Sequence, residues 1–184
     1  MEIPKITFNI AITLFIALIW VIFDSINLHF GAFLYAEKYL YAIYWLAGFR
    51  ILAIILFGYA GFFGVWLGYA LGGALLRDFE PMDAISLGLL SSSATLIAYR
   101  YWCKWIAGNE KFQNVSFLNL FYLMAMNAIL TAALRYSYLY FFKDASSTMI
   151  ALKTFAANIS GALLFMYALK LLFIGYKKFR PTHN

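Results

Sequence analysis

Charged residues are scarce in this sequence, and cysteine, histidine and proline are scarcer still. Charged side chains make up 12% of the 184 residues and hydrophobic side chains 65%. In a soluble domain about 25% of the residues are charged and about 45–50% are apolar. A soluble fold of this length has too much surface for its volume to hide that much apolar area. The composition therefore excludes an ordinary soluble domain, and we expect lipid to surround much of the chain.

The residues that usually carry chemistry are also few. The single cysteine, Cys103, excludes an internal disulfide. General acid–base catalysis uses positioned histidines or carboxylates, but His29 falls in a predicted loop, His183 falls in the tail, and no two carboxylates share a predicted helix core. Clusters of metal ligands are missing as well. We therefore expect a protein that is not an enzyme, with no cofactor and no metal site.

Long apolar segments fill most of the chain, and a spanning helix needs about 20 mostly apolar residues. The fold class we predict is all-α, a polytopic transmembrane bundle of about six helices, with residues 1–176 as one domain and 177–184 as a short basic cytoplasmic tail. A turn at residues 58–61 separates the second helix from the third. The predicted helices cover residues 6–23, 39–57, 62–76, 82–102, 115–142 and 148–176.

The positive charges predict an orientation. The net charge is +6, which we assign to the membrane and not to nucleic acid, because cytoplasmic loops collect Lys and Arg. With six helices, seven cations fall on the side of the N-terminus and three on the other side, so both termini are predicted to be cytoplasmic. The seven are Lys5, Arg100, Lys104, Lys111, Lys177, Lys178 and Arg180, and the three are Lys38, Arg77 and Lys143.

Three glycines, Gly64, Gly68 and Gly72, lie on one face of the third predicted helix. Small residues at this spacing let two helix backbones approach closely in lipid. The pattern therefore predicts a helix-packing interface, either inside this bundle or between subunits.

Polar side chains inside the apolar segments are the candidate ligand-binding residues. Arg50 is a functional candidate because a charge in hydrocarbon is unfavourable, and no acid falls in a predicted helix centre to pair with it. Its alternatives are snorkelling and a structural pair. For Arg135, near the outer end of its helix, snorkelling is favoured. Asn127 and Asn158 either bond across helices or line a ligand site, to which Trp45 could contribute.

Several segments resemble a known family. These are WLAGFRILAIILFG over residues 45–58, the Gly64 and Gly68 pair that follows, and FAANISGALL over residues 155–164. The pattern, which covers roughly residues 40–172, resembles the membrane-associated sensor domain (MASE type one) of bacterial signalling proteins. Asn158 stands where that family usually has an acid, and the family usually has eight helices and an attached output domain. The resemblance implies an input module of the bacterial inner membrane.

The sequence thus predicts a non-enzymatic sensory or accessory subunit that binds a membrane partner or a small ligand within the bilayer. Its expected partners are membrane lipids and either another membrane protein or a second copy of itself. The alternative is the substrate-binding component of a small-solute (vitamin-type) transporter, whose six-helix subunits are of similar length. A membrane enzyme acting on a lipid or quinone is disfavoured, because the histidine and acid pairs that it would need are missing.

Overall fold

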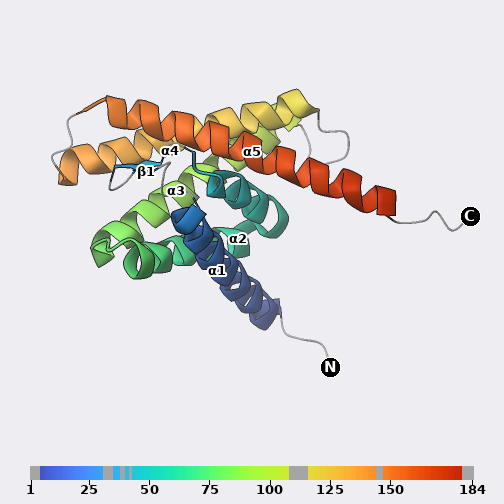
Figure 1. Ribbon diagram of the computed structural model, residues 1–184, viewed down its shortest axis with the longest axis horizontal. Helices are drawn as coiled ribbons and strands as arrows, with labels where there is room; N and C mark the ends of the chain where they lie inside the picture. Colours follow the sequence, from blue (N-terminus) through green and yellow to red (C-terminus); the bar gives the residue numbers. More distant parts are fainter. Residues whose placement is uncertain are drawn as a thin grey trace, which may run out of the picture.

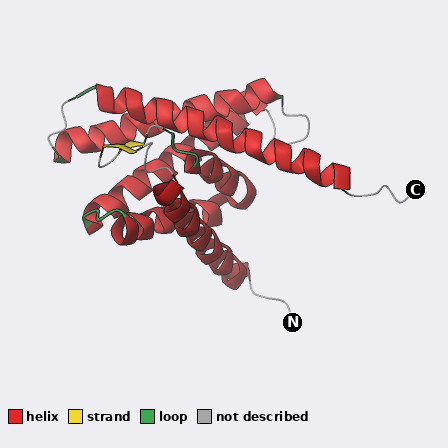
Figure 2. Cartoon of the chain, in the orientation of Figure 1, coloured by secondary structure: helices red, strands yellow, loops and turns green. Residues whose placement is uncertain are grey.

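A computed structural model describes residues 5–30, 35–37, 40–41, 43–107, 116–143 and 147–179 of the chain (Figure 1). Helices account for almost all of this part (Figure 2). The long helices are α1 (Lys5–Phe30), α2 (Leu46–Leu76), α3 (Pro81–Trp102), α4 (Phe117–Phe142) and α5 (Met149–Phe179). A π-helical turn, η2 (Cys103–Ala107), extends α3, and a two-residue strand, β2 (Leu40–Tyr41), pairs antiparallel with β1 (Tyr35–Glu37).

Each of these five helices contains a segment long and apolar enough to cross a bilayer. The prediction of an all-α, multi-pass membrane protein is therefore confirmed, but the number of six helices is wrong. The second and third predicted helices are one element, α2, and residues 40 and 41 belong to β2 instead. The part of α2 before Gly58 has only 12 residues, from Leu46 to Phe57. At 1.5 Å per residue it is about 18 Å long, which is short of the roughly 30 Å hydrocarbon core.

The predicted break at Gly58 is present inside α2. Gly58 has φ 55° and ψ −121°, a conformation that is open to glycine and strained for other residues. Beyond it the chain turns back on itself, since a Cβ built on Gly61 would lie 2.2 Å from the carbonyl oxygen of Ala53. In a straight helix these two residues would be about 12 Å apart along the axis. The two halves of α2 therefore pack side by side.

The predicted glycine face lies against α1. A Cβ on Gly64 would come within 2.7 Å of Ile16, and one on Gly68 within 2.6 Å of Trp20. One on Gly72 would lie 2.7 Å from the Asp24 carboxylate. Because both residue numbers rise together along this contact, the second half of α2 runs parallel to α1. In lipid such close backbone packing replaces the hydrophobic drive of soluble proteins.

The remaining helices alternate in direction. Trp66 donates from its indole to the carbonyl of Ile85 at 3.1 Å, and Gly73 packs against Ala84, so α3 runs antiparallel to the second half of α2. Trp102 donates to the carbonyl of Asn119 at 2.7 Å, near the end of α3 and the start of α4. As a result α1 begins and α5 ends on the same side of the bundle, which is the right-hand side of Figure 1.

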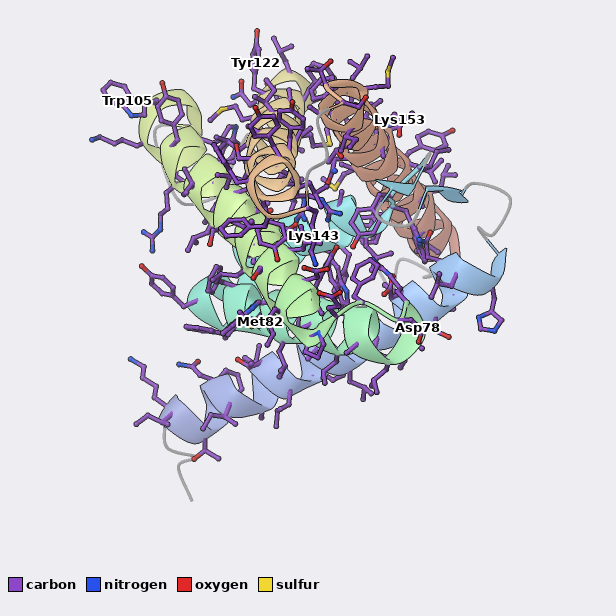
Figure 3. All side chains as sticks on the ribbon, turned by 90° about the vertical axis from the view of Figure 1, so that its left-hand side faces the viewer. Asp78, Met82, Trp105, Tyr122, Lys143 and Lys153 are labelled. Atoms are coloured by element: carbon purple, nitrogen blue, oxygen red, sulfur yellow. The ribbon has the colours of Figure 1, made fainter. Side chains whose placement is uncertain are left out.

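The two ends of the bundle differ in charge. We call the end that holds Lys5, Arg100 and Lys104 the basic end. The other is the acidic end, and Figure 3 looks onto it, with Asp78 and Lys143 among its labelled residues. The carboxylates of Asp24, Asp78, Glu80 and Asp83, whose side chains the structure describes, all lie towards the acidic end.

Two predicted loops begin as helix. Asp24, assigned to the first loop, lies within α1, which continues to Phe30. The segment that begins at Cys103 continues α3 as a π-helical turn instead of leaving the helix. In both places the chain extends the helix beyond its apolar stretch, because a helix satisfies its backbone hydrogen bonds internally where lipid cannot. Lys38, Lys111 and Arg180, used in the predicted topology, lie outside the described residues, as does the rest of the tail from residue 181 to 184.

Trp20 is the centre of the packed interior. Its side chain is fully buried, and its ring centroid lies 6.1–6.3 Å from those of Tyr44, Phe49 and Tyr69. The outer surface is apolar too: Phe15 and Leu18 on α1 are each 60% exposed. Such exposed apolar side chains are expected where hydrocarbon is the solvent.

We expect Gly68→Leu to destabilise the protein, because its side chain would displace Trp20 from the core. Overpacking of this kind costs about 1–3 kcal/mol. Thermal unfolding in detergent measures the effect, with the lipid-facing Ala74→Leu as the matched control. Equal melting temperatures for the two variants would contradict the proposed packing.

Candidate functional site

Arg50 lies in the short first half of α2 and is completely buried. Its Nη2 donates to Asn158 Oδ1 of α5 at 2.9 Å and to Thr131 Oγ1 of α4 at 3.2 Å. Nε and Nη1 have no hydrogen-bond partner among the described residues. A guanidinium has five N–H donors, of which Nε and Nη1 carry three. The two bonds that it makes hold three helices together around one charge.

A polar stripe on α4 faces this arginine. Asn127, Thr131 and Arg135 follow one another at four-residue spacing, which places them on one helix face. Asn127 Oδ1 accepts from Thr95 of α3 at 2.6 Å and from Thr131 at 3.4 Å. The chain of bonds therefore runs from α3 through α4 to Arg50 on α2, and on to Asn158 on α5. We call these five residues, Arg50, Thr95, Asn127, Thr131 and Asn158, the polar centre.

Further polar atoms lie beside the polar centre without a partner in the described part of the chain. They are Asn127 Nδ2, Ser91 Oγ and Thr154 Oγ1, all buried. Ser91 is one turn before Thr95, and Thr154 is one turn before Asn158. Burial of an unsatisfied polar group costs about 1–3 kcal/mol. The interior at this level thus has more hydrogen-bonding capacity than the described side chains use.

Arg135 is buried as well, with 7% of its surface exposed, and its Nη1 donates to the hydroxyl of Tyr69 at 2.8 Å. The predicted snorkelling is therefore wrong. Tyr69 comes from the second half of α2, which the break at Gly58 brings beside α4. The sequence could not supply this partner, because its position depends on how the broken helix folds back.

A salt bridge between Asp24 of α1 and Arg77 at the end of α2 lies buried beside the same tyrosine. The Arg77 guanidinium is 5.4 Å from the centre of the Tyr69 ring. The sequence predicts Asp24 and Arg77 in separate loops and does not predict the pair. The signal was present, since Asp24 is four residues past Trp20 and so shares its helix face.

A second group of ion pairs lies at the acidic end of the bundle. Lys143, just after α4, contacts Glu80 at 2.8 Å and Asp83 at 3.0 Å. The Tyr138 hydroxyl also donates to Asp83 at 2.8 Å. The hydrogen bonds that the Lys143 ammonium donates to the Glu80 and Asp83 carboxylates raise its pKa, so it stays charged across the physiological pH range.

The charges do not balance at the polar centre. The buried carboxylates of the described residues are those of Asp24 and Asp83, and these contact Arg77 and Lys143. The hydrogen bonds of Arg50 go only to neutral side chains. A cation held by neutral dipoles in a low-dielectric interior attracts an anion more strongly than it would in water.

The predicted site residues thus separate into groups. Arg50, Asn127 and Asn158 meet in the polar centre, and Arg135 lies one turn farther along α4. Trp45 does not join them: its ring packs on Phe23 of α1 at 5.2 Å. Thr131 was missed, although its spacing from Asn127 and Arg135 would have identified it.

Within the described ranges, no group of three or more His, Cys, Asp or Glu side chains could hold a metal ion. Comparison with protein-family models, curated proteins and solved structures found no match to this chain. The resemblance to the membrane-associated sensor domain stays a prediction. The fold by itself defines a multi-pass α-helical membrane protein with a buried polar centre.

We expect Asp24→Leu to destabilise the fold by about 3–5 kcal/mol, because it leaves the Arg77 charge buried without its carboxylate. Replacing both partners, as in Asp24→Leu with Arg77→Met, should recover most of that loss. Thermal unfolding of the two single variants and the double variant gives the coupling. Glu80→Gln, at an exposed ion pair, is the control and should melt with the wild type. If the loss of stability in the double variant equals the sum of the losses in the two single variants, the buried pair is excluded.

Proposed function

We propose that this chain is a non-enzymatic sensory or accessory membrane subunit that binds a small anionic or strongly polar group in its polar centre. The observation that carries the proposal is the fully buried Arg50, with Nε and Nη1 unpartnered among the described residues. Ionisable residues within membrane helices commonly mark functional sites.

The neighbouring atoms favour a ligand with acceptor oxygens. Nε and Nη1 of Arg50 and Nδ2 of Asn127 are donors, and the hydroxyls of Ser91 and Thr154 can donate too. Charge-assisted hydrogen bonds to a carboxylate or phosphate are about twice as strong as neutral ones. An anion would thus compensate the charge and use the remaining donors at the same time.

The site is also suited to transmitting a signal. Arg50, Thr95, Asn127 and Asn158 come from four different helices, so an anion bound to them would change contacts between those helices. Output would then pass through the helices to a membrane partner. The resemblance to a sensor domain favours the same role. With the basic end on the cytoplasmic side of the membrane, α1 would begin and α5 would end in the cytoplasm.

The Arg50 proposal is tested by ligand-induced stabilisation. A panel of carboxylates and phosphates is added to the purified protein in detergent, and its melting temperature is measured. A ligand at 100 times its Kd adds about 2.7 kcal/mol, equivalent to a rise of about 5–10 °C for a chain of this size. We expect Arg50→Gln to remain folded and to lose the shift, and Lys153→Gln to keep it. An unchanged ligand-induced rise in melting temperature in Arg50→Gln would contradict the proposal that Arg50 binds the anion.

A substrate-binding transport component is a second candidate, favoured by the break in α2. Discontinuous helices beside a polar site near the bilayer midplane are typical of transporters. Here the short half of α2 carries Arg50 to α4 and α5. Transport requires the site to open to both sides of the membrane in turn.

Accessibility separates these two functions. Thr131→Cys, made in a Cys103→Ala background, places one thiol in the polar centre. For a transporter we expect a membrane-impermeant thiol reagent to label it from either side of oriented vesicles, and added substrate to change the rates. For a sensory subunit we expect labelling from one side at most. Labelling from both sides would therefore rule out the purely sensory function.

A further inference from the structure

A groove of about 700 Å³ runs along the outside of the bundle between α1, α2 and α3. Ile10, Leu14 and Phe63 are among its apolar lining residues. The Thr13 hydroxyl and the Trp66 indole also line it, but both donate to backbone carbonyls of the protein, at 3.3 Å and 3.1 Å. Apart from the Asn9 amide, which also lines the groove, the walls therefore offer mainly hydrocarbon contact to an occupant.

The length of the groove matches one leaflet of a bilayer. Its lining on α2 extends from Tyr59 to Ala70, which corresponds to about 16 Å at 1.5 Å per residue. Half of the hydrocarbon core is about 15 Å. An acyl chain lying in the groove would thus reach from the headgroup level to the bilayer centre.

The mouth of the groove at the basic end is positively charged. The Arg100 guanidinium lies 5.5 Å from the ring centre of Tyr59, which lines the groove. Lys5 immediately precedes Ile6, another lining residue. Lys104, one turn beyond Arg100, lies 5.1 Å from the ring of Trp105, which points away from the bundle in Figure 3. Exposed aromatic rings beside cations are typical of the headgroup level.

We propose that this groove binds an anionic phospholipid, with one acyl chain between α1 and α2 and the phosphate against Arg100, Lys104 and Lys5. Apolar walls of one leaflet's length, with Arg100 beside Tyr59 and Lys5 next to Ile6 at one end, fit both parts of such a molecule. Basic pockets between membrane helices bind anionic headgroups in this way. A second copy of the chain fits less well, because a symmetric dimer in one membrane would bring two basic ends together at the same depth.

The lipid site is independent of the polar centre. The groove residues lie on the outer face of α1, α2 and α3, whereas Arg50 bonds to α4 and α5 inside the bundle. Failure of one proposal therefore leaves the other standing.

Competitive lipid binding to the full chain in detergent tests the proposal. Native mass spectrometry compares phosphatidylglycerol with phosphatidylcholine of the same acyl chains. We expect the wild type to prefer phosphatidylglycerol and Arg100→Gln with Lys104→Gln to bind it about 30-fold more weakly, which corresponds to about 1 kcal/mol for each charge. Ala70→Phe, which fills the groove, should weaken both lipids. Lys170→Gln removes a cation at the same end of the bundle, beside a different groove, and should change neither.

Three results would overturn the proposal. One is equal binding of the two lipids by the wild type. Another is unchanged phosphatidylglycerol binding in the Arg100 and Lys104 double variant, both of whose altered side chains are exposed. The third is efficient disulfide cross-linking of two chains through Leu14→Cys in a Cys103→Ala background, which would assign the groove to a second copy.

Discussion

The burial of one guanidinium group organises this membrane protein. Arg50 is surrounded by hydrophobic helices, so the protein itself must supply the partners that water would provide in a soluble domain. Thr131 and Asn158 supply them from α4 and α5, and Asn127 links Thr131 to Thr95 on α3. Separation of these helices in lipid would leave a charge and several dipoles unsatisfied. The polar centre is therefore both the element that fixes how four helices meet and the strongest candidate for a binding site.

The break at Gly58 allows the two halves of α2 to contact different helices. Its first half carries Arg50 to α4 and α5, and its second half packs its glycine face on α1 and its opposite flank on α3. A continuous helix of 31 residues would be about 46 Å long and could not place both halves within one bilayer at these positions. The glycines of the second half are needed for a different reason. Lipid offers little hydrophobic drive for helix association, so close backbone packing must replace it.

The charged side chains have different partners at different depths of the bundle. Asp24 and Arg77 neutralise each other where the bundle is packed, and Glu80, Asp83 and Lys143 do so at the acidic end. At the basic end the exposed cations Arg100 and Lys104 lie beside the aromatic rings of Tyr59 and Trp105, the setting in which we propose that an anionic lipid binds. Only Arg50 combines complete burial with purely neutral hydrogen-bond partners in the described part of the chain.

Composition and spacing determined by themselves that the chain is a helical multi-pass membrane protein. They also identified Arg50, Asn127 and Asn158 as its unusual polar residues and Gly58 as a break, because lipid solvation and helix periodicity are local properties that a sequence states directly. The tertiary structure decided which helix each of these residues meets. Arg135 donates a hydrogen bond to Tyr69 and does not extend to the membrane surface, and Asp24 pairs with Arg77, 53 positions away in the sequence. The two halves of α2 fold back on each other at Gly58. Such pairings depend on the direction in which a broken helix returns and on which backbones can approach closely, and these are properties of the packed bundle as a whole.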